Sequence, residues 1–251
     1  MRLLSIFSLV LLLSACTSLI DKPSTSNAFT INQIGSQQLV LVITDDDEAI
    51  NGQLTRFEKV NNQWRSVANS HQVVIGRTGL AWGIGLHPKQ AGYHKQEGDG
   101  KAPAGIFNLS ASFGYLDQIS TGLDYQQMSA DDFCIDVKGS PYYNQTVNRK
   151  AVGEKAVEGS SEPMRRDIHK QDKVYKKGIF VDHNPQNVSG QGSCIFVHLW
   201  RQSNTPTAGC TAMAEGHLDV LLNWLDKSAS PILVALTAKE YRRLKPQWQL
   251  P

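Results

Sequence analysis

Residues 192–213 read GSCIFVHLWRQSNTPTAGCTAM, which joins an apolar, β-branched run to a short polar loop and a Gly-Cys pair. The apolar run at 194–199 predicts a buried strand that delivers His198. Beyond the loop, leucines recur at helical spacing, so we expect a helix over 212–225 that begins just after Cys210. The order of strand, loop and helix therefore predicts that an imidazole and a thiol lie close together.

This expected position of Cys210 would give it unusual chemistry. A helix N-terminus supplies a positive dipole end and unpaired N–H groups, which favour the thiolate over the thiol. Cys210 would then be a nucleophile toward an acyl carbon, with His198 as its general base. Backbone N–H groups of Ala208, Gly209 and Cys210 are expected to bind the developing oxyanion. A buried structural cysteine beside a core histidine is the alternative interpretation.

The rest of the chain is dominated by short strand-like segments. They are expected at residues 38–44, 54–60, 63–67, 72–75, 106–109, 133–137, 178–181, 194–199 and 232–236. Asn61-Asn62 should join two of them as a hairpin. Residues 144–173, here called the excursion, are polar, charged and aperiodic, which indicates a surface lid or rim. The expected fold is mainly β, a sandwich or barrel-like sheet with one or more packed helices.

The N-terminus predicts a compartment. An apolar run too short to span a bilayer ends in Leu13-Ser14-Ala15-Cys16, which resembles the lipobox of bacterial lipoproteins. The resemblance implies a signal peptide over 1–15 and lipidation of Cys16, although a plain signal peptide with a chance cysteine is the alternative. A tether over 16–37, a catalytic domain over 38–240 and a tail over 241–251 would follow. We expect a periplasm-facing envelope lipoprotein, at the outer membrane if the cell has two.

The cysteine count is informative in such a compartment. If Cys16 carries lipid, Cys134, Cys194 and Cys210 remain, and one disulfide plus one free thiol is the simplest arrangement. The apolar, strand-like surroundings of Cys134 and Cys194 favour these two as the pair. A rival assignment makes Cys194 the nucleophile with His183 as base, but a mid-strand residue has no oxyanion donors.

Charge and ligand spacing point away from other functions. The formal net charge of +2 comes with no basic block, so nucleic acid is not an expected partner. Asp182-His183-Asn184 lacks a second cluster of metal ligands, so we expect no metal and no other cofactor.

Several motifs in the same order resemble the L,D-transpeptidase catalytic domain, also called the YkuD domain. His198 followed by Thr207-Ala208-Gly209-Cys210 matches the histidine and the Ser/Thr-x-Gly-Cys motif of that family. Residues 97–107 are similar to its EGDGxTPxGxF stretch. Patterns similar to a less-studied lipoprotein branch occur at residues 76–83, 142–144, 164–167, 181–184 and 207–215. The resemblance covers residues 38–236.

The resemblance implies an L,D-transpeptidase (YkuD) fold and an activity on peptidoglycan stem peptides. Cys210 would attack the bond after meso-diaminopimelate in a tetrapeptide stem, expel D-Ala, and pass the acyl group to an amine. A hydrolase of the same fold would cut peptidoglycan peptide or peptidoglycan-protein bonds with the same residues. A non-catalytic envelope lipoprotein is a third alternative. No protein partner is predicted.

Two positions depart from the better-known branch of that family, which has a histidine before the Gly-Cys pair and an arginine two residues after it. This chain has Ala208 and Ala212 there. Arg201, or Arg165 and Arg166, are candidates to bind a substrate carboxylate instead, because arginine pairs bidentately with such groups. The candidate substrate-binding residues are Arg201, His183, Thr207 and Trp200, the last as a contact for a glycan.

Overall fold

The computed structural model describes residues 28–251, so the expected signal peptide and Cys16 lie outside the described residues. The strands are β1 (Gln38–Thr44), β2 (Asn51–Val60), β3 (Gln63–Ser66), β4 (His71–Val74), β5 (Leu80–Trp82), β6 (Ala102–Gly114), β7 (Tyr125–Gln127), β8 (Asp132–Cys134), β9 (Thr146–Asn148), β10 (Glu162–Pro163), β11 (Lys177–Val181), β12 (Phe196–Leu199), β13 (Thr211–Met213) and β14 (Ile232–Thr237). The helices are α1 (Arg149–Val152), α2 (Glu154–Val157), α3 (Arg166–His169), α4 (Glu215–Trp224) and α5 (Ala238–Trp248), with 3-10 turns η1 (Ile31–Ile34) and η2 (Lys227–Ala229).

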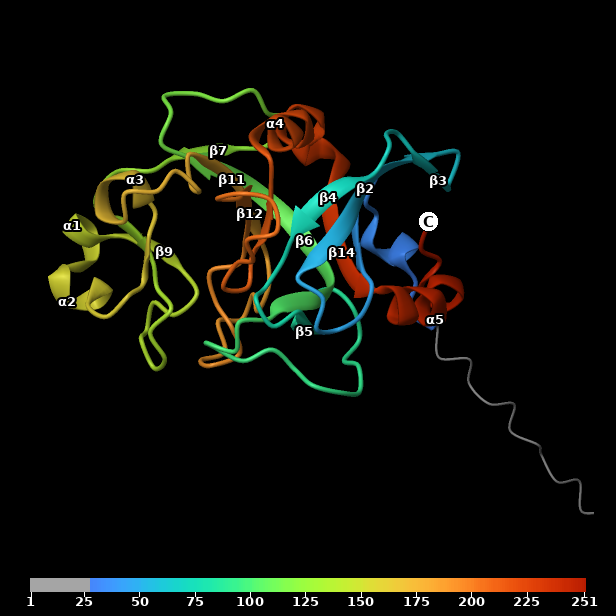
Figure 1. The fold of residues 1–251 in the computed structure, drawn as a ribbon, viewed down its shortest axis with the longest axis horizontal. Coiled ribbons are helices and arrows are strands. Elements are labelled where there is room, and N and C mark those ends of the chain that lie inside the picture. Colours follow the sequence, from blue (N-terminus) through green and yellow to red (C-terminus); the bar gives the residue numbers. More distant parts are fainter. Residues whose placement is uncertain (1–27) are drawn as a thin grey trace, which may run out of the picture.

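Eight strands close into a barrel in the order β1-β14-β6-β11-β12-β13-β4-β2, because β2 pairs back onto β1 (Figure 1). The closing pair is antiparallel, from Gln38 opposite Glu58 to Thr44 opposite Gly52. The predicted hairpin joins β2 to β3, with Asn61 and Asn62 at positive φ of 50° and 61° as a tight turn requires. The prediction of a mainly β domain with packed helices is confirmed, and its sheet is a barrel.

Both ends of the described chain extend the domain beyond the expected boundaries of 38 and 240. Ile31 of η1, expected in the tether, is fully buried in the main core. The expected tail contains most of α5, which packs on β14 and β1 through Leu244 and Trp248. These two residues are four apart on one helix face, and the mostly charged residues of the rest of the helix conceal the pattern in the sequence. No helix within residues 28–251 has the length and apolar character needed to cross a membrane.

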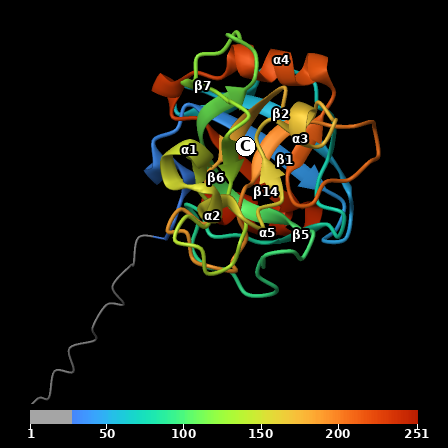
Figure 2. The same ribbon diagram turned by 90° about the vertical axis from the view of Figure 1, so that its left-hand side faces the viewer.

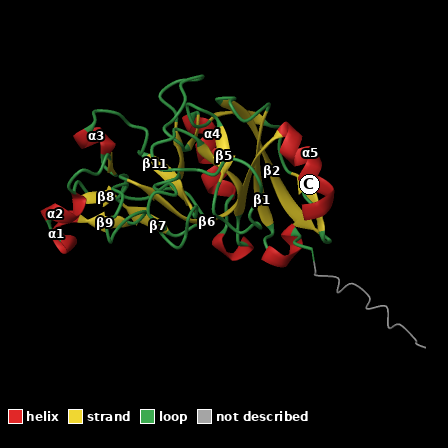
Figure 3. Ribbon diagram, turned by 90° about the horizontal axis from the view of Figure 1, so that it is seen from below, coloured by secondary structure: helices red, strands yellow, loops and turns green. Residues whose placement is uncertain are grey.

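The excursion forms a small unit of its own. Its strands β9 and β10 flank β8 in a three-stranded sheet, and α1, α2 and α3 are single turns attached to it. Figure 3 shows α1, α2, β8 and β9 at the end of the molecule opposite α5. Figure 2 looks from that end and shows this unit in front of the barrel strands. The excursion is therefore a folded cover over one end of the barrel.

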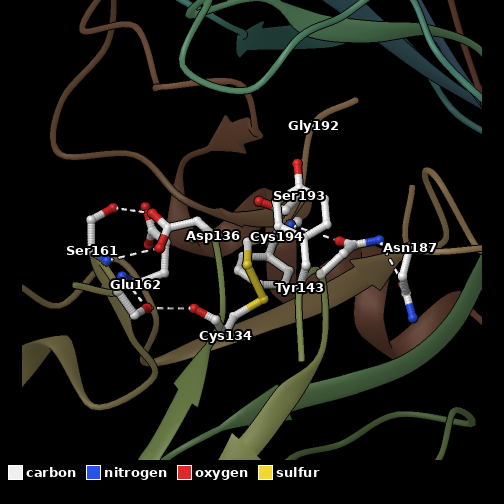
Figure 4. The surroundings of a disulfide bond; sticks show 12 residues. Cys134, Asp136, Tyr143, Ser161, Glu162, Asn187, Gly192, Ser193 and Cys194 are labelled. Carbon is white, nitrogen blue, oxygen red and sulfur yellow. Dashed lines mark hydrogen bonds between the residues drawn. A yellow bond between two sulfur atoms is a disulfide. The ribbon is translucent and has the colours of Figure 1, made fainter. Parts of the chain in front are cut away.

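A disulfide ties β8, the central strand of the three-stranded sheet, to the segment that precedes β12. Cys134 at the end of β8 is bonded to Cys194, and the two Cα atoms are 5.9 Å apart (Figure 4). Cys194 was expected inside a strand, but it precedes β12 in a loop and has a positive φ of 55°. Its N–H donates to Asn144 Oδ1 at 2.9 Å, so a side chain of the excursion satisfies the turned backbone.

Candidate active site

The pairing of β12 with β13 places the candidate nucleophile. These strands run parallel, with Val197 opposite Thr211, so Cys210 comes to lie beside Phe196. The Phe196 N–H donates to Cys210 Sγ at 3.3 Å, and Sγ donates to the Cys194 carbonyl oxygen at 3.5 Å. Cys210 is the one free cysteine among residues 28–251, and it is buried.

The local structure around Cys210 differs from the predicted helix start. The residues after it form β13, which is inserted between β12 and β4, and α4 begins only at Glu215. The leucine stripe starts at Leu218, so residues 211–213 were free to form a strand. The thiol therefore has no helix N-terminus beside it. Burial instead raises the pKa of Cys210 to about 12, and the negative charge of Glu162 adds to this effect.

His198 on β12 is held in a neutral form with a defined tautomer. Its Nδ1 lies 2.8 Å from the Leu199 carbonyl oxygen, and because a carbonyl only accepts, Nδ1 must carry the proton. The lone pair of the neutral ring is therefore on Nε2. Burial lowers the pKa of His198 to about 4, and the positive charges of Arg166 and Arg201 act in the same direction. The ring of Tyr175 packs edge-on against the imidazole, with the two ring centroids 5.2 Å apart.

The thiol and the imidazole line one cavity of about 290 Å³, here called the cationic cavity. It is lined by Ser161, Glu162, Arg166, Lys170, Val174, Tyr175, His198, Trp200, Arg201, Thr205, Pro206, Thr207, Ala208 and Cys210. Three of the four residues expected to bind substrate, namely Trp200, Arg201 and Thr207, are therefore beside the Cys/His pair. Neither hydrogen bond of Sγ involves His198, so the pair must approach during proton transfer.

Thr207 fixes the loop that carries the nucleophile. Its Oγ1 donates to the Cys210 carbonyl oxygen at 2.6 Å and accepts from the Gly209 N–H at 3.1 Å. The Gly209 N–H is thus already engaged, which leaves those of Ala208 and Cys210 as candidate oxyanion donors. A Cβ at residue 209 would lie 3.0 Å from the Lys101 carbonyl oxygen, so the close approach of these loops favours glycine.

Two of the three candidate arginines reach the cationic cavity. Arg166 and Arg201 share Asp172, with N–O distances of 2.7 and 2.9 Å, and Arg166 also lies 3.5 Å from Glu162. Arg166 is only 12% exposed and forms ion pairs with both Asp172 and Glu162. Arg201 is 51% exposed and pairs with Asp172 alone. Arg165 pairs with a neighbouring aspartate and does not line the cavity. Arg201 is therefore the guanidinium most accessible to a substrate carboxylate.

The fourth expected substrate residue, His183, lies elsewhere. It lines a separate cavity of about 520 Å³, which Cys194 also lines and which does not include Cys210 or His198. Its Nδ1 accepts from the Ile84 N–H at 3.3 Å, and its Nε2 donates to the Gln191 carbonyl oxygen at 2.9 Å. Both ring nitrogens are thus used to join loops, and the residue is 2% exposed. The rival nucleophile Cys194 is consumed by the disulfide.

Sequence reasoning did not find three charged or polar residues near Cys210. Glu162 and Tyr175 line the cationic cavity and are joined by a hydrogen bond of 2.7 Å. Lys95, which is 4% exposed and paired with Asp99 at 2.9 Å, comes close to Gly209. All three reach Cys210 from distant parts of the chain. The only sequence signal was the expectation that the excursion contributes to a substrate rim.

A second cavity, of about 240 Å³, meets Cys210 from the other side and is here called the acidic cavity. It is lined by Arg77, Lys95, Glu97, Gly98, Asp136, Ser161, Glu162, Ser193, Cys194, Ile195, Ala208, Gly209 and Cys210. Ser161 and Glu162 line both cavities, so this short piece of the excursion lies over the thiol. Figure 4 shows both residues near the disulfide, with Ser161 bonded to Asp136.

Within residues 28–251, no group of three or more His, Cys, Asp or Glu side chains is arranged to hold a metal ion. The arrangement around Cys210 is instead that of a thiol, a neutral imidazole, backbone N–H groups and charged side chains. Such a set can carry out nucleophilic acyl transfer.

No protein-family model matches the chain, and no curated protein matches it. Among solved structures, the chain is similar to the helical cell shape determining protein Pgp2 from Campylobacter jejuni, with 14% identity and a TM-score of 0.33. The alignment covers 82% of this chain and 53% of Pgp2, so the chain spans about half the length of that protein. A likeness of this size supports no conclusion about activity.

Proposed function

We propose that this chain is a cysteine acyltransferase of the bacterial envelope, an L,D-transpeptidase that acts on peptidoglycan stem peptides. The observation that carries the proposal is the shared cavity of Cys210 and His198, in which Nδ1–H is fixed on a carbonyl and Nε2 is left basic. The sequence motifs around both residues resemble those of L,D-transpeptidases, and this resemblance supplies the substrate class.

The protonation states constrain the first chemical step. Burial keeps both partners neutral in the resting site, with the thiol pKa at about 12 and the imidazole pKa at about 4. Forming a free thiolate-imidazolium pair is therefore strongly uphill. The proton of Sγ would move to Nε2 as sulfur attacks the acyl carbon, while the N–H groups of Ala208 and Cys210 stabilise the oxyanion. His198 would then give the proton to the leaving amine.

The charges of the cationic cavity fit the proposed donor. A tetrapeptide stem brings carboxylates, and a guanidinium is a strong partner for such groups. Arg201 is half-exposed beside the Cys/His pair, and one of its terminal N–H groups donates to Asp172. It would take the role of the arginine that this chain lacks at Ala212. No cofactor is needed for this chemistry.

The test is incubation of the full-length protein with disaccharide-tetrapeptide, followed by mass analysis. We expect release of D-Ala and 3-3 cross-linked dimers, and neither product from Cys210→Ala. Intact-protein mass spectrometry after carbapenem treatment should show one added drug mass, absent in Cys210→Ala. Tripeptide without dimer would identify a hydrolase instead. If the wild-type protein gave neither of these products and no carbapenem adduct, the proposal would be refuted.

We also propose that lipidation of Cys16 anchors the domain to the envelope, at the outer membrane of a two-membrane cell. The support is the lipobox resemblance of residues 13–16. Cys16→Ser should move the protein from the membrane fraction to the soluble fraction while acylation by a carbapenem continues. A variant that still sediments with membranes after a high-salt wash would refute the anchor.

A further inference from the structure

A carboxylate lies beside the candidate nucleophile. Glu162 of β10 lines both cavities that meet at Cys210. Its Oε2 accepts a hydrogen bond from the Tyr175 hydroxyl at 2.7 Å and lies 3.5 Å from Arg166 Nη1. Both contacts use Oε2, so Oε1 is available to a ligand. The side chain is 19% exposed, and its contacts with Tyr175 and Arg166 hold it in place, while burial raises the pKa of its carboxyl above the ordinary value.

The acidic cavity has the charge to attract a cation. Three carboxylates, those of Glu97, Asp136 and Glu162, line it together with two cations, Arg77 and Lys95. The ammonium of Lys95 is paired with Asp99 at 2.9 Å, and Glu162 has Arg166 at 3.5 Å, so Glu97 and Asp136 are the lining carboxylates without an ion pair of this kind. The cationic cavity, which also reaches Cys210, carries three basic side chains and only one carboxylate, that of Glu162. A protonated amine is therefore drawn to the acidic side, and a carboxylate to the cationic side.

We propose that Glu162 binds the protonated amine of the acceptor and removes its proton before the amine attacks the Cys210 thioester. The inference rests on the proposed function and concerns its second half. An ammonium has no lone pair, so an amine acceptor must lose a proton within reach of the acyl carbon. A carboxylate that lines both cavities at the thiol is suited to this role.

Transfer to the amine forms one bond, breaks one bond and moves two protons. The Glu162 carboxylate takes one proton from the ammonium, and the nitrogen lone pair forms the new C–N bond to the acyl carbon. The C–S bond breaks, and its electron pair stays on Cys210 Sγ. A second proton leaves the nitrogen through His198 Nε2 and restores the thiol. Glu162 then releases its proton to water, so the cycle needs no further reactant.

The consequence is selection of an amine over water. With Glu162 ionised, the acceptor amine is concentrated and made nucleophilic at the thioester, whereas water gains nothing from charge attraction. Glu162→Gln keeps the size of the side chain and an oxygen for Tyr175 but removes the charge. We expect this variant to shift the fate of the acyl-enzyme from transfer to hydrolysis.

The experiment measures the ratio of cross-linked dimer to hydrolysed tripeptide for the full-length protein supplied with disaccharide-tetrapeptide. Glu162→Gln should lower this ratio about 10²-fold, the usual contribution of a general base. The variant should still form the carbapenem adduct, which shows that its site is folded. Glu158→Gln, an exposed glutamate of the same excursion, is the matched control and should keep the wild-type ratio.

Hydroxylamine provides a second measurement, because it is largely unprotonated near neutral pH and needs no base to become a nucleophile. It should intercept the acyl-enzyme of Glu162→Gln as well as that of the wild type. An unchanged dimer-to-tripeptide ratio in Glu162→Gln would overturn the inference and leave the proposed function intact. A wild-type protein that forms no acyl-enzyme would overturn both.

Discussion

Two buried histidines, one on each side of the Cys194 segment, look nearly identical by burial and charge. His183 is 2% exposed and His198 is 7% exposed, and burial lowers the pKa of each to about 4. They differ in their ring nitrogens. His183 uses both, to join the loops at Ile84 and Gln191, whereas His198 uses only Nδ1.

This difference separates a structural histidine from a candidate base. A ring with both nitrogens bonded inside the protein has no lone pair to offer a substrate. A ring with one nitrogen fixed has its tautomer set and its other nitrogen free. A depressed pKa alone therefore does not identify the reactive residue, and the hydrogen-bond partners do.

Replacing each histidine by alanine should give opposite phenotypes, which is the largest effect we expect. His198→Ala should reduce acylation of Cys210 by about 10³-fold or more, because nucleophile and base act as a unit. His183→Ala should retain acylation but unfold at lower denaturant concentration, since two backbone groups lose their partners. The rate of carbapenem labelling measures acylation in both variants, and urea titration measures their stability. Equal losses of acylation would break the distinction between the two residues.

The disulfide between Cys134 and Cys194 should contribute strongly to stability. It closes a loop with a sequence separation of 60 residues, for which chain entropy gives up to about 4 kcal/mol. The double variant Cys134→Ser/Cys194→Ser should therefore unfold at a clearly lower urea midpoint. Cys210→Ser is the control, because it changes a buried thiol without opening the loop. Equal midpoints for the double variant and the wild type would contradict this role.

Both histidines should also make the fold sensitive to mild acid. Each has a folded pKa of about 4, below the value of about 6.5 in the unfolded chain. Above pH 6.5 both states are neutral and this stability is fully present. As pH falls toward 4, only the unfolded state takes up the protons, so stability is lost, by at most about 3 kcal/mol per histidine. Melting temperatures recorded between pH 7 and pH 4.5 should fall, and His183→Gln should weaken the dependence.

At the same time, His198 should remain a neutral base in mild acid. Its ring NMR signals should not titrate between pH 7 and pH 5. A titration midpoint near pH 6.5 would show that the imidazole is accessible to water and would contradict its lowered pKa.

The smallest effect concerns the loop beside His198. Thr207→Val keeps the shape of the side chain but removes its hydrogen bonds to Gly209 and Cys210. A loss of about 1–2 kcal/mol in positioning corresponds to roughly tenfold slower acylation. Thr207→Ser should stay close to the wild type. If Thr207→Val reacted at the wild-type rate, the loop would be held by Gly209 and the surrounding backbone alone.

Local patterns in the sequence predicted most of the barrel strands, the hairpin at Asn61-Asn62 and the shared location of Cys210 and His198. They failed where distant pairing decides the structure. Residues 211–213 became a strand because β12 and β4 leave a place between them, which no local pattern reveals. Glu162 reaches Cys210 because β10 pairs with β8, and His183 was misassigned because its partners are backbone groups. Helix α5 was missed because two apolar residues in a charged segment give a weak periodic signal.

The position of the disulfide also has a consequence for how the protein is made. Three cysteines, Cys134, Cys194 and Cys210, can form three different pairs, and two of these consume the candidate nucleophile. Cys210 Sγ lies 3.5 Å from the Cys194 carbonyl oxygen, so proximity in the finished fold gives little protection against the wrong pair. Oxidative folding of the chain must therefore select the Cys134–Cys194 pair, because a molecule with a disulfide at Cys210 would have no free thiol to react.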